Sequence, residues 1–119
     1  MEKQAHEEWE HGMKFYKYLV SRGGRVVLGP IAAPKKEWKD AEDVFTEVLA
    51  HEEKVTSLID AMVELSEKEK DHATRSMLNW FVDEQVEEEE HATEIVARLK
   101  NTGNSPMACH MLDRDLGSR

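Results

Sequence analysis

The 119 residues carry 25 acidic and 16 basic side chains, and the formal net charge of −9 disfavours nucleic acid as a partner and favours cations. Only six glycines and three prolines interrupt a sequence rich in Glu, Lys, Ala and Leu, which favours helix over strand. We therefore expect an all-α protein with a single domain over residues 1–119. The one cysteine, Cys109, permits no internal disulfide and no CxxC motif, which fits a cytoplasmic setting. No run of apolar residues is long enough to predict a membrane span.

The first predicted helix covers residues 2–22 and ends at Gly23-Gly24, where glycine can take the left-handed conformation. Its expected inner face carries Ala5, Glu8, His11 or Gly12, Phe15 and Leu19. Residues 24–39 then form a connection, in which Pro30 and Pro34 exclude helix and a Val-Val-Leu run indicates a short extended piece. The connection can reach about 50 Å, which exceeds the roughly 42 Å length of a 28-residue helix. The helices on either side of it can therefore run parallel.

The second predicted helix covers residues 40–67, with Asp40 as its N-cap. Its expected inner stripe consists of Phe45, Val48 or Leu49, Glu52, Val55, Ile59 and Met62. The polar segment that ends at Asp71 is short, so this helix and the next should form an antiparallel hairpin. The third helix is predicted over residues 72–101, with Asp71 as its cap, and a short amphipathic helix over residues 107–116.

Acidic side chains interrupt the apolar stripe of the third helix. At helical spacing this stripe consists of Met77, Phe81, Glu84, Glu88, His91, Ile95 and Leu99. Burial of an ionised acid costs roughly several kcal/mol unless the acid is paired or binds a metal. Such a cost is a sizeable part of the stability of a domain. The stripe therefore predicts a bound cation.

Two other helices supply matching ligands at the same level. If the hairpin turns near Lys70, Glu52 and Glu88 lie 18 residues before and after it, because 70 − 52 and 88 − 70 are equal. The first helix places Glu8 at a similar height. His11 and His91 each follow an inward glutamate by three residues, so each Glu-x-x-His pair can offer a carboxylate and an imidazole to one site.

This pattern is similar to the ligand plan of di-iron carboxylate bundles, which use two lone glutamates and two Glu-x-x-His pairs. Here Glu52 is one lone glutamate, and no helix of the chain carries the other. Iron, manganese and zinc all suit such ligands. The alternative for each pair is a solvated or core-satisfied histidine, and His91 can face water because it follows an acidic run. The remaining charges are expected on solvated faces, among them Glu89, Glu90, Lys35 and Lys36.

Three segments of the sequence resemble the second, third and fourth helices of non-haem prokaryotic ferritins: HEEWEHGMKFYKYL, HEEKVTSLI and NWFVDEQVEEE. The resemblance covers nearly the whole chain. It implies a ferritin-like helical bundle with a long crossover loop, truncated to three long helices plus a short C-terminal helix. The family's first helix and the start of its second are lacking, and with them the glutamate that completes the first iron's coordination.

The resemblance also implies an iron chemistry. It places Glu8 and His11 on one iron, Glu8, Glu52 and Glu88 around the second, and Gln85 beside the pair. A further iron site is implied at Glu7, Glu84, Glu87 and Glu88. In the family such ferroxidase centres oxidise Fe(II) with dioxygen or peroxide, and the ferric product is stored inside a hollow shell of twenty-four subunits.

Alternative functions remain open on the sequence alone. At His91 the sequence is more similar to the haem-containing bacterioferritins than to the non-haem branch. However, Trp9 stands where those proteins place their haem-ligating methionine, so we expect no haem. A truncated, non-catalytic iron-binding or assembly subunit is one alternative, which the missing glutamate favours. Rubrerythrin-like peroxide reduction is another, which the lack of a CxxC pair disfavours. The missing helix should leave an apolar groove, so we expect a homo-oligomer in which a symmetry-related chain fills it.

Overall fold

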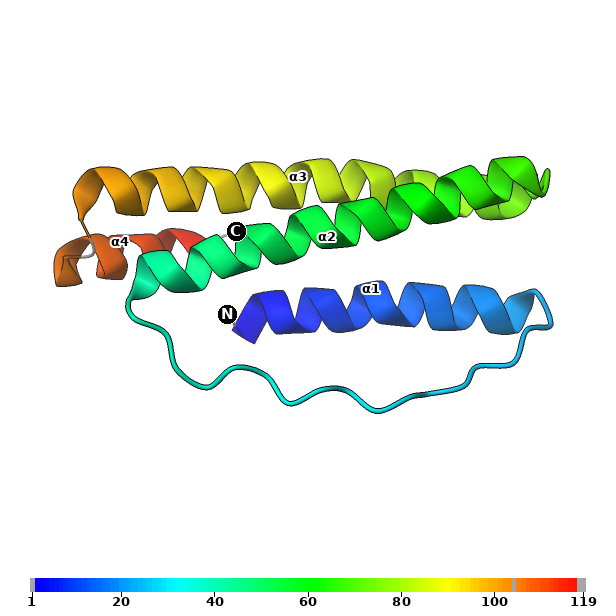
Figure 1. The fold of residues 1–119 in the computed structure, drawn as a ribbon, viewed down its shortest axis with the longest axis horizontal. Coiled ribbons are helices and arrows are strands. Elements are labelled where there is room, and N and C mark those ends of the chain that lie inside the picture. The colour runs from blue at the N-terminus through cyan, green and yellow to red at the C-terminus, as the bar shows by residue number, and fades with distance from the viewer. Residues whose placement is uncertain (1, 104, 118–119) are drawn as a thin grey trace. The chain divides into compact units, whose positions relative to one another are not determined.

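The computed structural model describes residues 2–103 and 105–117. The regular structure in these ranges is entirely helical, with α1 (Glu2–Ser21), α2 (Ala41–Lys68), α3 (His72–Thr102) and α4 (Pro106–Gly117) (Figure 1). The all-α prediction is confirmed, and each observed helix end lies within one residue of the predicted one. The chain divides into a unit that contains α1 and a unit, Glu37–Leu112, that contains α2 and α3, and each unit is described by itself. The single-domain prediction stays a prediction.

Glycine ends α1, as the sequence predicts. Gly23 has a φ of 77°, a left-handed conformation that side chains with a Cβ rarely adopt. Its N–H donates to Val20 O over 3.0 Å, and the N–H of Gly24 donates to Leu19 O over 2.8 Å, so the last carbonyls of the helix are satisfied. The connection that follows, residues 24–38, contains neither helix nor strand.

Two aspartates cap the helices of the hairpin. The side chain of Asp40 accepts a hydrogen bond from Asp43 N over 2.9 Å, and the side chain of Asp71 accepts one from Thr74 N over 3.0 Å. Each bond satisfies a backbone N–H that has no partner within its helix. Both predicted N-caps are therefore confirmed.

The turn between α2 and α3 depends on a lysine in a left-handed conformation. Lys70 has a φ of 56° and is the one non-glycine residue with a positive φ in the part of the chain that the structure describes. Its N–H donates to Glu67 O over 3.1 Å, while the N–H of Asp71 donates to Ser66 O over 2.8 Å. This is the hydrogen-bond pattern with which glycine commonly ends a helix. Lysine carries a steric cost at this position.

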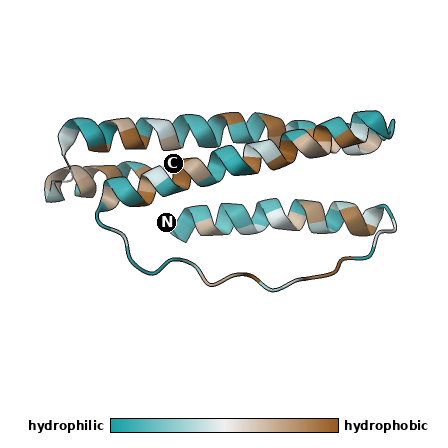
Figure 2. Cartoon of the chain, in the orientation of Figure 1, coloured by the Kyte–Doolittle hydropathy of each residue, from teal (hydrophilic) through white to brown (hydrophobic). Residues whose placement is uncertain are grey.

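The two helices of the hairpin pack against each other (Figures 1 and 2). The buried and half-buried residues between them form a seam and follow alternating spacings of three and four, as in a coiled coil. Leu78 and Leu99, at the two ends of the α3 seam, are 0% and 1% exposed. The seam of α3 consists of Leu78, Phe81, Gln85, Glu88, Ala92, Ile95 and Leu99, and that of α2 consists of Phe45, Leu49, Glu52, Thr56, Ile59, Val63 and Ser66.

Several positions of the predicted α3 stripe were out of phase by a single residue. Met77, Glu84 and His91 are only half-buried, whereas the neighbouring Leu78, Gln85 and Ala92 are buried. Both phases share Phe81, Glu88, Ile95 and Leu99, so the periodicity alone could not separate them; the packing of α2 against α3 decides the phase. On α2, Met62 is 36% exposed, so its predicted place on the inner stripe was also wrong.

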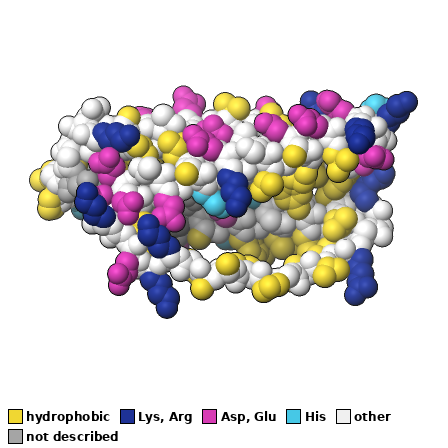
Figure 3. Space-filling model, in the orientation of Figure 1, with side chains coloured by type: hydrophobic (Ala, Val, Ile, Leu, Met, Phe, Trp, Pro, Cys, Tyr) yellow, Lys and Arg dark blue, Asp and Glu magenta, His cyan; other side chains and the backbone are white. Residues whose placement is uncertain are grey.

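Apolar side chains remain uncovered in both units. None of the described residues of α1 is buried. On α2, Leu58, Met62 and Leu65 lie at spacings of four and three, and all three are exposed. Figure 3 shows further hydrophobic side chains along the connection, where Ile31 is 96% exposed. Exposed apolar side chains of this kind are typical of proteins that associate, which agrees with the expected homo-oligomer.

Replacement of Lys70 by glycine should stabilise the protein by about 1 kcal/mol, because glycine relieves the left-handed strain at this turn. The same change at Lys68, inside the last turn of α2, should instead destabilise it by about 1 kcal/mol. Urea unfolding of both variants at one protein concentration measures the difference. A lower unfolding midpoint for Lys70→Gly would contradict the account of the turn.

Candidate metal site

A buried carboxylate lies at the middle of the hairpin seam. Glu52 is 5% exposed and Gln85, opposite it on α3, is 6% exposed. Gln85 Nε2 donates to Glu52 Oε2 and to the main-chain oxygen of Glu52, each over 3.3 Å. A neutral amide is thus the hydrogen-bond donor to this buried acid from α3. A neutral donor offsets only part of the cost of burying a charge, which makes the carboxylate ready to accept a cation.

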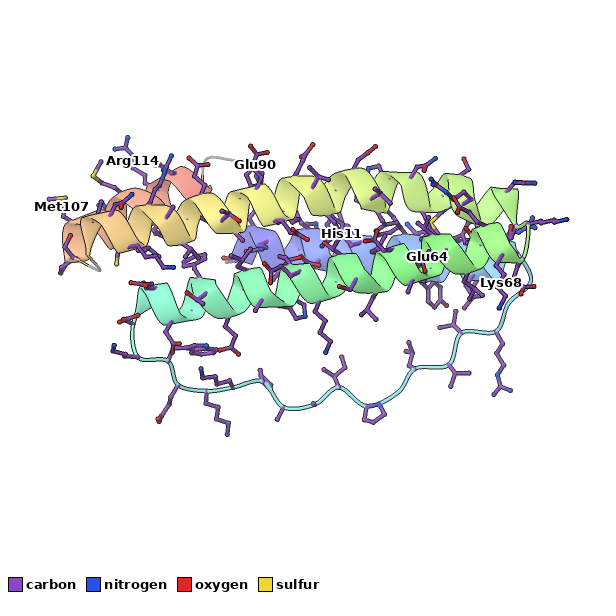
Figure 4. The ribbon with its side chains drawn as sticks, turned by 45° about the horizontal axis from the view of Figure 1, so that its top comes forward. His11, Glu64, Lys68, Glu90, Met107 and Arg114 are labelled. Atoms are coloured by element: carbon purple, nitrogen blue, oxygen red, sulfur yellow. The ribbon has the colours of Figure 1, made fainter. Side chains whose placement is uncertain are left out.

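A threonine and a second glutamate extend this polar contact. Gln85 Nε2 also donates to Thr56 Oγ1 over 3.3 Å, and Thr56 Oγ1 in turn donates to Glu89 Oε1 in a very short hydrogen bond. Glu89 is half-buried, so its predicted place on a solvated face was wrong. The reason is that the hydroxyl of Thr56 reaches across the seam to it. Glu90 is exposed, as predicted, and Figure 4 shows it pointing away from α3.

An exposed imidazole adjoins the other oxygen of the buried carboxylate. His51 Nδ1 lies 3.9 Å from Glu52 Oε1, and the His51 side chain is 70% exposed whereas that of Glu52 is 7% exposed. The carboxylate therefore has its Oε2 atom bound to Gln85 and its Oε1 atom near the solvent-facing His51. Sequence reasoning did not select His51, although its position directly before Glu52 was the available signal.

The level predicted for Glu52 and Glu88 agrees with the observed register. The hydrogen bonds from Gln85 to Glu52 and from Thr56 to Glu89 join residues 33 positions apart, and the midpoints of the two pairs bracket Lys70. Glu88 lies on the same seam as Gln85, about 4.5 Å further along the axis of α3. Glu52 and Glu88 are thus at neighbouring heights on facing helices. Their roles as metal ligands stay predictions.

The other predicted ligands of α3 lie beside the seam. Glu84 and His91 are half-buried, Glu87 is exposed, and Glu84, Glu88 and His91 each have at least one contact with another side chain or backbone group. The assignment of Glu84 and Glu87 to a further iron site stays a prediction, and so does the place of His91 in a Glu-x-x-His pair with Glu88.

On α1, the first Glu-x-x-His pair has the geometry that the spacing predicts. Glu8 Oε2 lies 3.6 Å from His11 Nδ1, so both side chains project from one face of the helix. Glu7 instead pairs with Lys3, with 3.7 Å between its Oε1 atom and Nζ. Figure 4 labels His11 on α1. Within this unit, Glu8 and His11 can offer an oxygen and a nitrogen to one ion.

Within residues 2–103 and 105–117, no three His, Cys, Asp or Glu side chains are grouped closely enough to hold a metal ion. The structure instead brings together the Glu8–His11 pair on α1 and places Glu52 and Glu88 at adjacent levels of the hairpin. Thr56 and Glu89 extend the polar contacts of Gln85, which donates to Glu52. Thr56 follows Glu52 by one helical turn, a spacing that could have drawn attention to it.

The facing helices of the hairpin carry carboxylates on their seam, and α1 carries a Glu-x-x-His pair. Such donors occur in the carboxylate metal proteins built on helical bundles. The model of one family, described as ferritin-like domain, matches residues 1–106. The chain belongs to this ferritin-like family. The family finding and the relatives below confirm the resemblance to non-haem prokaryotic ferritins.

Curated relatives include two staphylococcal proteins, each described as bacterial non-heme ferritin. The protein of Staphylococcus aureus (strain USA300) is 36% identical over 116 residues, and that of Staphylococcus haemolyticus (strain JCSC1435) is 39% identical over 116 residues. In both cases the match covers 98% of this chain and 70% of the relative. Each relative is therefore longer than this chain.

Solved structures similar to this chain are also ferritins. An open pore ferritin from the hyperthermophilic archaeon Archaeoglobus fulgidus has a TM-score of 0.91 and 41% identity, over 96% of this chain and 70% of that one. A structure described as humanized archaeal ferritin has a TM-score of 0.93 and 41% identity, over 98% of this chain and 70% of that one. The ferritin-like fold predicted from the sequence is confirmed.

The amide of Gln85 should matter for the stability of the metal-free protein. Gln85→Leu removes the side-chain donor to Glu52 and should cost about 1–3 kcal/mol, because a buried acceptor loses its partner. The double variant Glu52→Leu with Gln85→Leu should recover most of that loss, since it removes both polar groups. Urea unfolding in a chelator measures both variants. A double variant no more stable than Gln85→Leu alone would contradict the proposed pairing.

Proposed function

We propose that this chain is the subunit of an iron-storage ferritin, which binds Fe(II) at a di-iron carboxylate centre, oxidises it to Fe(III) and stores the product in an oligomeric shell. The observation that carries the proposal is the buried Glu52 carboxylate, held by a neutral amide on the seam of a hairpin that belongs to the ferritin-like family. A metal cation is a partner that stabilises such a buried carboxylate. Iron is the substrate and cargo of this chemistry.

Each predicted ligand has a role in the proposal. Glu8 and His11 hold one iron, while Glu8, Glu52 and Glu88 surround the second. Carboxylate and imidazole donors suit Fe(II), and the low dielectric around Glu52 strengthens its attraction to the ion. Glu7, Glu84 and Glu87, together with Glu88, form a further iron site, and His91 can pair with Glu88 as its Glu-x-x-His partner.

The oxidation transfers electrons from the bound ions to the oxidant, which also takes up protons. Two Fe(II) ions give one electron each to dioxygen, which takes up two protons and leaves as hydrogen peroxide; with peroxide as the oxidant, the same two electrons and two protons give two waters. Haem has no place in this reaction, and the curated relatives are described as non-heme. The residues of this chain bind and orient the two ions, and Gln85 keeps the Glu52 carboxylate in place.

A second candidate function is that of a non-catalytic iron-binding or assembly subunit. One observation favours it: among the described residues, no three His, Cys, Asp or Glu side chains are grouped closely enough to hold a metal ion. This candidate function predicts iron binding without fast oxidation.

Rubrerythrin-like peroxide reduction gains no support from the relatives and structures described above. A cytoplasmic location is part of the proposal, and the single cysteine supports it.

Replacement of Glu52 by alanine separates the two functions. In the variant, the initial rate of Fe(II) oxidation after anaerobic loading and admission of air should fall at least about tenfold, because a ligand to the second iron is lost. The exposed neighbour Glu53 provides the matched control, and Glu53→Ala should oxidise iron at the wild-type rate. Light scattering establishes that both variants assemble like the wild type. Fewer than one tightly bound iron per wild-type chain, with oxidation no faster than in buffer, would overturn the proposal.

The uncovered apolar side chains predict a homo-oligomer. A second copy of the chain should cover Leu58, Met62 and Leu65, which are exposed on α2. Light scattering at micromolar concentration should therefore report an oligomer, and the variant Leu58→Glu with Leu65→Glu should shift the population toward smaller species. A stable wild-type monomer at that concentration would show that no copy covers this stripe.

A further inference from the structure

Four side chains of α2 and α3 form a continuous row of hydrogen bonds across the hairpin. Thr56 Oγ1 donates to Glu89 Oε1, and Gln85 Nε2 donates both to Thr56 Oγ1 and to Glu52 Oε2, each over 3.3 Å. We refer to these residues as the Glu89–Thr56–Gln85–Glu52 row. It begins at the half-buried Glu89 and ends at the buried Glu52. Ionised carboxylates can only accept hydrogen bonds, so the two residues between them must supply the donors.

The single hydroxyl proton of Thr56 fixes the orientation of the next residue in the row. Because this proton is donated to Glu89, Thr56 can offer only its lone pairs to Gln85. The end of the Gln85 amide that faces Thr56 must therefore be the NH₂ group. A rotated amide would place the carbonyl oxygen of Gln85 against three acceptors, which are Thr56 Oγ1, Glu52 Oε2 and Glu52 O. The row thus specifies one orientation of the amide.

We propose that Thr56 is a positioning residue for the iron centre: with Glu89 behind it, Thr56 holds the N–H groups of Gln85 on the Glu52 carboxylate. The inference rests on the proposed function, because it treats Glu52 as a metal ligand. It also assigns Gln85 a supporting role. The amide nitrogen is directed to Glu52, so Gln85 acts on the metal through that carboxylate.

The contribution of Thr56 becomes important when Glu52 binds a cation. The ion withdraws negative charge from the carboxylate and weakens its attraction for the amide N–H, while it attracts the amide carbonyl oxygen. Glu52 alone would then no longer determine which end of the amide faces it. The lone pairs of Thr56 still require a donor, so the amide keeps its orientation. Hydrogen bonds that orient a metal ligand in this way commonly change metal affinity about 10–100-fold.

The choice of threonine on the seam supports this role. Position 56 lies between Glu52 and Ile59 on the inner face of α2, where an apolar residue would pack without the need for a partner. Threonine is also a weaker helix former than leucine or alanine. The hydroxyl is satisfied only because Glu89 reaches it from α3. Thr56 and Glu89 are therefore a matched pair that packing alone does not require.

The test is a set of Co(II) titrations with the full chain, since Co(II) can report binding without oxidation. Thr56→Val should weaken Co(II) binding about tenfold, and Thr56→Ser, which keeps the hydroxyl, should bind like the wild type. In a Gln85→Leu background, Thr56→Val should cause no further loss, because Thr56 acts through Gln85. Wild-type affinity in Thr56→Val, or equal losses in both backgrounds, would overturn the proposal.

Crystal structures of the metal-free proteins give a readout that does not depend on metal binding. In Thr56→Val the Gln85 amide should leave Glu52 Oε2 or rotate, whereas in Thr56→Ser it should stay in place. An unmoved Gln85 in Thr56→Val would overturn the proposal even if the wild type bound Co(II). A wild type that bound no Co(II) would instead refute the proposed function, and these structures alone would then decide the role of Thr56. If Thr56→Val does not fold, Glu89→Leu frees the hydroxyl proton and should also release the amide; an unchanged amide there would count against the row.

Discussion

The burial of the Glu52 carboxylate is the constraint on which the rest of the hairpin depends. An acid that is 5% exposed, with an amide as its hydrogen-bond donor from the facing helix, is a costly feature in a domain whose net stability is on the order of 5–15 kcal/mol. Replacement of such a group by an apolar residue would commonly stabilise a fold. We attribute its presence on the seam to the proposed metal binding and not to folding.

The seam itself gives this carboxylate a rigid setting. Leu78 and Leu99, both almost fully buried, fix the two ends of α3 against α2. Gln85 and Glu88 occupy the middle of the same seam, so their positions are determined by apolar packing on either side. Glu52 faces them from α2. The hairpin thus presents its polar groups at adjacent levels of one seam without flexible loops between them, which suits the proposed metal site.

The features that sequence reasoning found are those set by local chemistry. Asp40 and Asp71 were recognised as N-caps, and Gly23 as a helix end, because each acts on its own backbone neighbours. Glu52 was found because an acid on an apolar stripe is anomalous in one helix alone. The features that were missed require two helices at once: Thr56 and Glu89 have meaning only when α2 and α3 are in register, and the left-handed Lys70 follows from the short turn that joins them. The metal-ligand roles were implied by the family resemblance, and neither α2 nor α3 shows them by itself.

The most direct test of the central claim is a crystal structure of the protein soaked anaerobically with Fe(II), with data collected at the iron absorption edge. We predict anomalous peaks within coordination distance of the carboxylates of Glu52 and Glu88, one of them shared with Glu8. Gln85 should contact Glu52 and not the metal. Iron found only at exposed acids such as Glu87 and Glu90, with none at Glu52, would contradict the account.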